Sequence, residues 1–146
     1  MRLWHYKLLP YLPELQFKGQ LREMVAILHD LKHKGKTNHL SINRVVEYPK
    51  ADLYRYFCEY EAEYFSRYGK TLDEYSSEFG SFANWNVDTK NNTIFDGWHN
   101  TEYLRVCMAN LYEKHHFGIG KSRITDEEWR RLLYGYNRIT GEEYAI

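Results

Sequence analysis

The chain has little cysteine, no net charge and no long apolar run, and each of these features excludes a class of protein. Its 146 residues include two cysteines, Cys58 and Cys107, which form no C-x-x-C unit, so we expect two buried free thiols rather than a disulfide. A formal charge of zero excludes a globally basic nucleic-acid binder, although a local basic face is still allowed. No apolar run approaches membrane-spanning length, and Pro10 and Pro13 follow the opening leucines too closely for a signal peptide. We therefore expect a cytoplasmic protein without a membrane contact.

Aromatic side chains, in contrast, are abundant. They make up 17% of the chain and include fourteen tyrosines, a load that usually builds a core from rings whose hydroxyls reach the surface. We expect Trp4 and Trp98 to lie in this core. The chain is long enough for one domain with a substantial core and too short for two comfortable ones.

Apolar residues recur at three- and four-residue spacings along most of the chain, which predicts helices. The expected helices span 13–35, 49–68, a short segment from Thr71, a segment from Asn100 or Thr101 to Gly118, and a segment from Thr125. Two of them begin with apparent capping boxes, TLDE at 71–74 and TDEE at 125–128. Residues 80–97 are rich in Gly, Asn and Asp and predict a long loop, and the tail after Gly141 is expected to be loose. Residues 1–146 are therefore predicted to form a single all-α domain.

The zero net charge hides a segregation along the chain. Residues 18–44 hold six Lys or Arg against two acids, whereas residues 47–78 hold four Lys or Arg against eight acids. Such halves can give a molecule one side that faces DNA and another that faces solvent. The plainer alternative is a pair of solvated helix faces, and charge alone favours it.

The helix expected over 13–35 carries an unusual neighbourhood at Arg22 and Glu23. Its apolar face is predicted to hold Leu21, Met24, Val25, Leu28 and Leu31. Gly19 lies four residues before Glu23, and a glycine inside a helix costs about 1 kcal/mol relative to alanine. This spacing suggests that Glu23 needs open space above it. A surface Glu and a surface Arg beside a tolerated glycine remain the simpler reading of the spacing.

The segment GQLREM, at this distance from Met1, resembles the first helix of the pyrimidine dimer DNA glycosylase family, the endonuclease V type. The resemblance continues through NHLSINRVVEYPKADLYRYFCEYEAEYFSRYGK and is weaker over WHNTEYLRVCMANL. The opening MRLW resembles a bacterial branch of the family that begins M-R-[LI]-W. The resemblance implies a compact helical bundle of three long helices and several short ones.

The resemblance also implies the chemistry of a DNA repair glycosylase and AP lyase. In such enzymes the N-terminal α-amine attacks C1′ of the damaged nucleotide, a Schiff base forms, and β-elimination cuts the strand. An α-amine titrates near a pKa of ~8, against ~10.4 for lysine, so much more of it is neutral and nucleophilic. Met1 would supply the amine and Glu23 the carboxylate that stabilises the cationic intermediate and moves protons. Met1 is expected to be retained, because the bulky Arg2 normally blocks its removal.

The residues expected to contact DNA are Arg2, Lys18, Arg22, His39 and His99; Arg22 matches the basic neighbour of the family's glutamate, and both histidines match histidines of the family segments. The substrate implied is damaged double-stranded DNA, pyrimidine-dimer or abasic, with no cofactor, no metal and no membrane. The sequence does not fix the oligomeric state, and a monomer is expected.

Three positions depart from the family pattern. Leu3 and Ala26 stand where the family has basic residues, and Gln16 stands where it has a histidine near the start of the helix. These departures bear on lesion specificity more than on the fold. Two other functions therefore stay open: a DNA- or nucleotide-interacting module without chemistry, and a hydrolase that pairs Glu23 with His39 or His99. Imine formation, binding without imine formation, and dependence on a metal or histidine would distinguish the three.

Overall fold

The computed structural model describes residues 2–37, 39, 42–83 and 93–145, and within these ranges the chain is helical with no strand. Five α-helices are joined by three short 3-10 helices. In chain order they are η1 (Tyr6–Tyr11), α1 (Glu14–Lys34), η2 (Asn43–Glu47), α2 (Lys50–Tyr68), α3 (Asp73–Gly80), α4 (Thr101–His116), η3 (Gly120–Ser122) and α5 (Asp126–Thr140). The prediction of an all-α fold is confirmed. No helix of the described part is long and apolar enough to cross a membrane.

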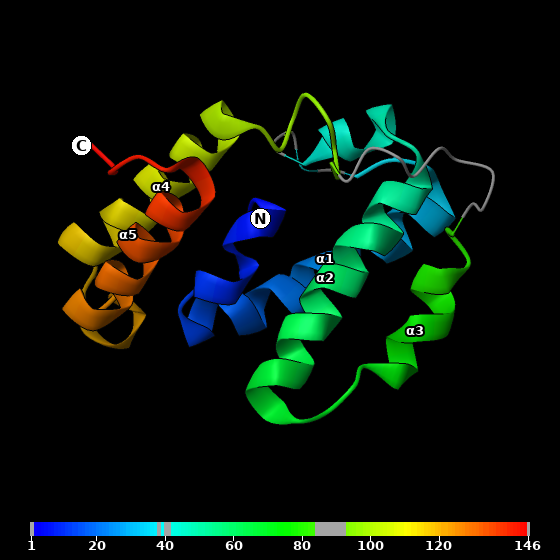
Figure 1. The fold of residues 1–146 in the computed structure, drawn as a ribbon. Helices are drawn as coiled ribbons and strands as arrows, with labels where there is room; N and C mark the ends of the chain where they lie inside the picture. Colours follow the sequence, from blue (N-terminus) through cyan, green and yellow to red (C-terminus); the bar gives the residue numbers. More distant parts are fainter. Residues whose placement is uncertain (1, 38, 40–41, 84–92, 146) are drawn as a thin grey trace.

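The N-terminal segment lies in the middle of the molecule (Figure 1). On one side it faces the pair formed by α4 and α5, which run side by side with the C-terminus near them, and on the other side it faces α1 and α2. The short helix α3 packs against α1 and α2 at the edge away from α4 and α5. The segment before α1 is therefore surrounded by helices that come from every part of the chain.

Prolines and glycines set the ends of the two longest helices, as the sequence predicts. Pro13 and Pro49 occupy the N-cap positions of α1 and α2, where a missing N–H costs nothing. Gly35 and Gly69 are the C-caps, with φ of 70° and 67°, a left-handed conformation that residues with a Cβ rarely adopt. The helix bounds predicted over 13–35 and 49–68 are confirmed to within a residue.

The two expected capping boxes differ in outcome. The box at Thr125 is present, because the Thr125 hydroxyl accepts from Glu128 N at 3.1 Å while Glu128 Oε1 accepts from Thr125 N at 2.9 Å. The box at Thr71 is absent: α3 begins one residue later than expected, after Leu72. Glu61 of α2 takes the capping role there, since its Oε2 accepts from Leu72 N at 2.9 Å. A neighbouring helix therefore supplies the cap that the local motif does not.

The buried face of α1 is rotated from the predicted one. Met24, Leu28 and Leu31 are buried as expected, whereas Leu21 and Val25 are only half-buried. The remaining positions of the buried face are Phe17, Gln20 and Ile27. This rotation places a glutamine, 1% exposed, in the core beneath the N-terminal segment.

The expected core tryptophans are confirmed, and one expected core cysteine is not. Trp4 and Trp98 are 7% and 3% exposed. Cys107 is a buried free thiol, and burial raises its pKa to about 11. Cys58 is also free but exposed, because it follows Phe57 around α2 and points away from the face that Phe57 buries. The predicted loop over 80–97 has residues 84–92 outside the described ranges.

Candidate functional site

Side chains, rather than a sheet, hold the backbone of the N-terminal segment. Over residues 2–6 the chain is extended or just entering η1, so its N–H and C=O groups have no helical partners of their own. Six of these groups bond to side chains from α1, α2, α4 and the turn before α4. The partners are Glu23 for Arg2 N, Gln20 for Arg2 O and Trp4 N, Tyr103 for Leu3 O, Tyr56 for Trp4 O and His99 for Tyr6 N. The segment is thus fixed in position from three directions.

Gln20 is the centre of this network. Its Oε1 accepts from Trp4 N at 2.8 Å, and its Nε2 donates to Arg2 O at 2.9 Å. The second Nε2 proton points toward Glu23 Oε2, 3.4 Å away. One buried amide therefore forms hydrogen bonds with the backbone on both sides of Leu3 and also contacts the carboxylate of Glu23, one helical turn further along α1.

Glu23 sits at the edge of α1 with its carboxylate against the start of the chain. Its Oε2 accepts a hydrogen bond from Arg2 N at 2.9 Å, and the side chain is half-buried. Gly19, one turn earlier, leaves this edge open: a Cβ there would meet only the Arg22 Nη2, 3.9 Å away, among the described atoms. Met1 itself lies outside the described residues.

Two tyrosines act as hydrogen-bond donors to the segment. Tyr56 OH donates to Trp4 O at 2.7 Å and lies 3.1 Å from Gln20 Oε1, and Tyr103 OH donates to Leu3 O at 2.6 Å. Burial raises the pKa of both phenols above the usual value of 10, so both keep the proton that they donate. The roles of Gln20, Tyr56 and Tyr103 were not expected from the sequence, because each side chain contacts a backbone group 16 to 100 residues away.

Two buried histidines complete the support. His5 and His99 are each 3% exposed, and their ring centroids are 5.2 Å apart. Burial lowers the pKa of His5 to about 4, and burial together with the nearby His5 lowers the pKa of His99 well below its usual value. Both rings are therefore neutral at pH 7. His99 Nδ1 accepts from Tyr6 N at 3.2 Å, which leaves the proton on Nε2.

A family model described as pyrimidine dimer DNA glycosylase matches residues 1–75, slightly more than half of the chain. The chain belongs to this family. The match covers the N-terminal segment, α1 and α2, and so includes Glu23, Gln20 and Tyr56. His99 and Tyr103, which hold the segment from the other side, lie beyond it. Searches of curated proteins and of solved structures found no match.

Membership of the pyrimidine dimer DNA glycosylase family implies a DNA substrate, so the position of each expected DNA-binding residue matters. Arg2 is half-buried, with its guanidinium over the Trp4 ring at 5.7 Å. Arg22 is exposed on α1 and points about 100° around the helix from Glu23. Lys18 is exposed on the same helix and pairs with Glu14 at 2.9 Å.

The two expected histidine contacts are placed differently from each other. His39 is exposed in the turn after α1, and the last residue of that helix, Lys34, is already about 16 Å along the axis from Glu23. His99 is buried, and its Nδ1 is occupied by Tyr6 N. The structure thus brings Arg2, Glu23 and His99 together around the N-terminal segment, while Lys18, Arg22 and His39 lie on outer surfaces.

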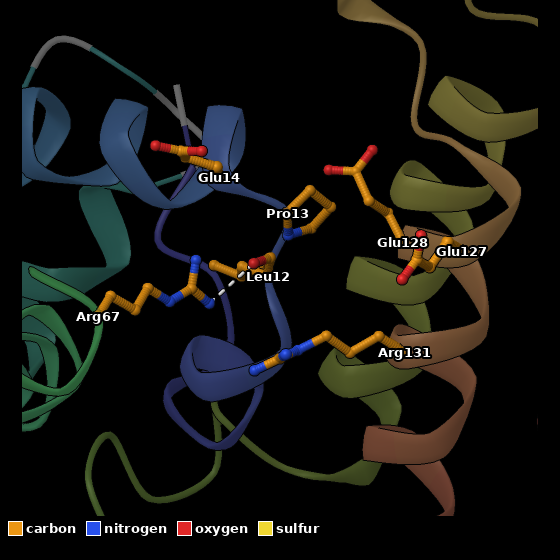
Figure 2. Close-up of a pocket in the computed structure, with 7 residues that line it drawn as sticks. All are labelled: Leu12, Pro13, Glu14, Arg67, Glu127, Glu128 and Arg131. Atoms are coloured by element: carbon orange, nitrogen blue, oxygen red, sulfur yellow. Dashed lines mark hydrogen bonds between the residues drawn. The ribbon is translucent and has the colours of Figure 1, made fainter.

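A hollow of about 520 Å³ lies between η1, the start of α1 and α5 (Figure 2). Its lining is charged, with Glu14, Glu127 and Glu128 around two arginines. Both arginines already have structural partners: Arg67 Nη2 donates to Leu12 O at 2.8 Å and Arg131 Nη2 donates to Pro10 O at 2.7 Å. We therefore interpret the hollow as a structural contact, in which arginines of α2 and α5 hold η1 and the residue after it.

The described residues show no group of three or more His, Cys, Asp or Glu side chains arranged to hold a metal ion.

Of the three departures from the family pattern, Leu3 is fully buried and packs in the core. Gln16 Oε1 is buried without a hydrogen-bond partner in the part of the chain that the structure describes. The site is thus built from a carboxylate, a clamped main chain and neutral aromatic supports.

Proposed function

We propose that this member of the pyrimidine dimer DNA glycosylase family cuts damaged duplex DNA as a glycosylase and AP lyase, through an imine formed by its N-terminal amine. The observation that supports this proposal is the 2.9 Å hydrogen bond from Arg2 N to Glu23 Oε2. It fixes a half-buried carboxylate beside the nitrogen at position 2. Because consecutive α-carbons are only about 3.8 Å apart, an amine on the preceding residue is tethered to the same neighbourhood.

The reaction follows from these groups. The neutral amine of Met1 attacks C1′ of the damaged nucleotide, and the base leaves with its bonding electrons and takes up a proton. The nitrogen then loses a proton, and its lone pair expels O4′ of the sugar, which takes up a proton as the ring opens, to give the iminium. A base then removes a proton from C2′, and the 3′ phosphate leaves with the electrons of the C3′–O bond. Glu23 stabilises the cationic intermediate and carries the protons between these steps. No cofactor enters the balance.

We propose direct DNA contacts for the exposed cations and an indirect role for His99. Arg22 and Lys18 project from the outer side of α1, and Arg2 lies at the carboxylate, so all three suit phosphate contacts near the reacting nucleotide. His39 suits a more distant contact. His99, being buried and bonded to Tyr6 N, supports the N-terminal segment from within.

Borohydride trapping tests the proposal. Wild type is expected to cut and to trap on abasic-site duplexes, and Glu23→Gln is expected to slow strand cleavage by about a hundredfold, because a positioned charge of this kind is worth on the order of 3 kcal/mol. Asp30→Asn is the matched control, since Asp30 lies on the same helix and pairs only with Lys34 among the described residues. Mass mapping of the trapped peptide identifies which nitrogen carries the sugar.

Each other outcome points elsewhere. A trapped adduct on Arg2 would mean that Met1 is removed and that the amine is the nitrogen bonded to Glu23. Tight binding without trapping would favour a DNA-interacting module without chemistry. Full activity in Glu23→Gln would remove Glu23 from the mechanism. A hydrolase that pairs Glu23 with a histidine gains no support, because His99 is buried and His39 lies beyond the far end of α1.

A further inference from the structure

The turn between α4 and α5 exposes large apolar side chains to solvent, although such side chains are usually buried in a folded protein. Phe117 is 70% exposed and Ile119 is 86% exposed, the two highest values among the exposed large apolar side chains of the described residues. They lie on either side of Gly118, in the turn that follows the end of α4, and Figure 1 shows this turn between α4 and α5 at its lower left. We call residues 114–123 the α4–α5 tip.

The α4–α5 tip is held in one shape. A Cβ at Gly118 would collide with the Lys114 carbonyl oxygen and lie 2.9 Å from the Arg123 Cα, so the chain closes on itself where only glycine fits. Ile124 N donates to Lys114 O at 3.1 Å, and Arg123 Nε donates to His115 O at 3.1 Å. A turn that is fixed in this way cannot fold its apolar side chains inward without breaking these bonds.

Residues 114–123 themselves carry charge of one sign, although Asp126 at the start of α5 contacts both His115 and Arg123. Residues 114–123 contain Lys114, Lys121 and Arg123, two histidines and no acid. Arg123 pairs with Asp126 at 3.5 Å, whereas Lys114 and Lys121 have no ion-pair partner in the part of the chain that the structure describes. Exposed apolar groups beside unpaired cations fit an anionic partner that also accepts apolar side chains, as duplex DNA does at thymine methyl groups and between base steps.

We propose that the α4–α5 tip is a second DNA contact, in which Phe117 and Ile119 enter a groove while Lys114 and Lys121 neutralise phosphates. This inference rests on the proposed function, because it takes the damaged duplex as the ligand. Phe117 is fourteen residues beyond Tyr103, whose hydroxyl bonds to Leu3 O beside the candidate site, and that spacing is about 21 Å along α4. At 3.4 Å per base step, a duplex whose axis runs along α4 would meet the tip about six base pairs from the lesion.

The test compares two abasic duplexes, one reaching about twelve base pairs on each side of the lesion and one closed by hairpin loops about three base pairs from it. Phe117→Ser combined with Ile119→Ser is expected to weaken binding of the long duplex about tenfold or more, because each apolar side chain of this size contributes strongly when buried. Binding and trapping on the short duplex are expected to stay at the wild-type level. Val106→Ser, on the same helix and 46% exposed, is the matched control and should change neither.

Salt dependence separates the two kinds of contact. Lys114→Ala combined with Lys121→Ala should lower the salt slope of long-duplex binding by about two, whereas the apolar double variant should leave the slope unchanged. Equal affinity of wild type and the apolar double variant for the long duplex overturns the inference while leaving the proposed function intact.

Three further outcomes also overturn it. If wild type binds vesicles that contain anionic lipid and the apolar double variant does not, while both have the same DNA affinity, the tip is a membrane contact. If wild type self-associates and the apolar double variant does not, again with the same DNA affinity, the tip contacts a second copy of the chain. If wild type neither binds nor traps either duplex, the proposed function fails first and the inference falls with it.

Discussion

At the scale of single residues, two glutamines of α1 are expected to affect the stability of the protein in opposite ways when they are replaced. Gln20 is 1% exposed and its amide satisfies Trp4 N and Arg2 O, whereas Gln16 has a buried Oε1 without a partner among the described residues. A buried group that loses its partner costs about 1–3 kcal/mol, while removing an unsatisfied group costs little or stabilises. The same substitution should therefore have different effects four residues apart.

We predict that Gln20→Leu lowers the free energy of unfolding by about 2–4 kcal/mol, because it strands the two backbone groups and weakens the position of Glu23. Gln16→Leu should stay within about 0.5 kcal/mol of wild type or exceed it. Urea unfolding of both variants measures the difference. If the hydrogen bonds of Gln20 also position the reacting groups, Gln20→Leu should trap more slowly than wild type under conditions in which both proteins are fully folded. Equal stability of the two variants would contradict the role of Gln20.

At the scale of helices, the two Thr-led motifs give a paired prediction. Thr125 caps α5 through its hydroxyl, whereas α3 takes its cap from Glu61. We predict that Thr125→Ala lowers the free energy of unfolding by about 1 kcal/mol and that Thr71→Ala, at the motif that forms no cap, changes it by less than about 0.5 kcal/mol. Thermal or urea unfolding decides it, and a comparable loss from Thr71→Ala would mean that its hydroxyl stabilises α3 after all.

The helices also show what the sequence could and could not predict. Helix limits were predictable, because Pro13, Gly35 and Gly69 act through their own backbone restrictions. The buried face of α1 was not, since Leu21 and Ile27 look equally apolar and only the packed N-terminal segment decides between them. A cap supplied by Glu61 from another helix leaves no local signal.

The candidate site divides in the same way. Glu23 was selected as a candidate through a resemblance to the family, and the family match over residues 1–75 confirms that resemblance. Gln20 was not found, although a polar residue three positions before Glu23, on the same face of the helix as Phe17 and Met24, was the available signal. Its partners are backbone groups, which no side-chain pattern identifies, so the clamp became visible only when the chain was folded.

At the scale of the whole molecule, the central N-terminal segment makes stability depend on pH. His5 and His99 join this segment to the turn before α4, while Tyr56 joins it to α2, so the segment connects the two halves of the molecule. Burial depresses the pKa of both histidines in the folded state. Protonating either ring therefore favours unfolding, and the cost is felt by the entire fold rather than by one loop.

The sign and the window follow from these shifts. His5 has a folded pKa of about 4 against 6.5 when unfolded, so between these values the unfolded chain binds more protons and stability falls as the pH falls. We predict a loss of up to about 1.4 kcal/mol per pH unit from His5 within this window, with His99 adding to it in the same direction. His5→Asn should flatten the dependence, because asparagine can still cap η1 at Lys7 N but does not titrate. Unfolding free energies measured from pH 7.5 to 4 test this, with the exposed His39→Asn as control. The difference between wild type and His5→Asn cancels the shared carboxylate contributions, so a difference that does not change with pH would show that His5 does not take up a proton on unfolding.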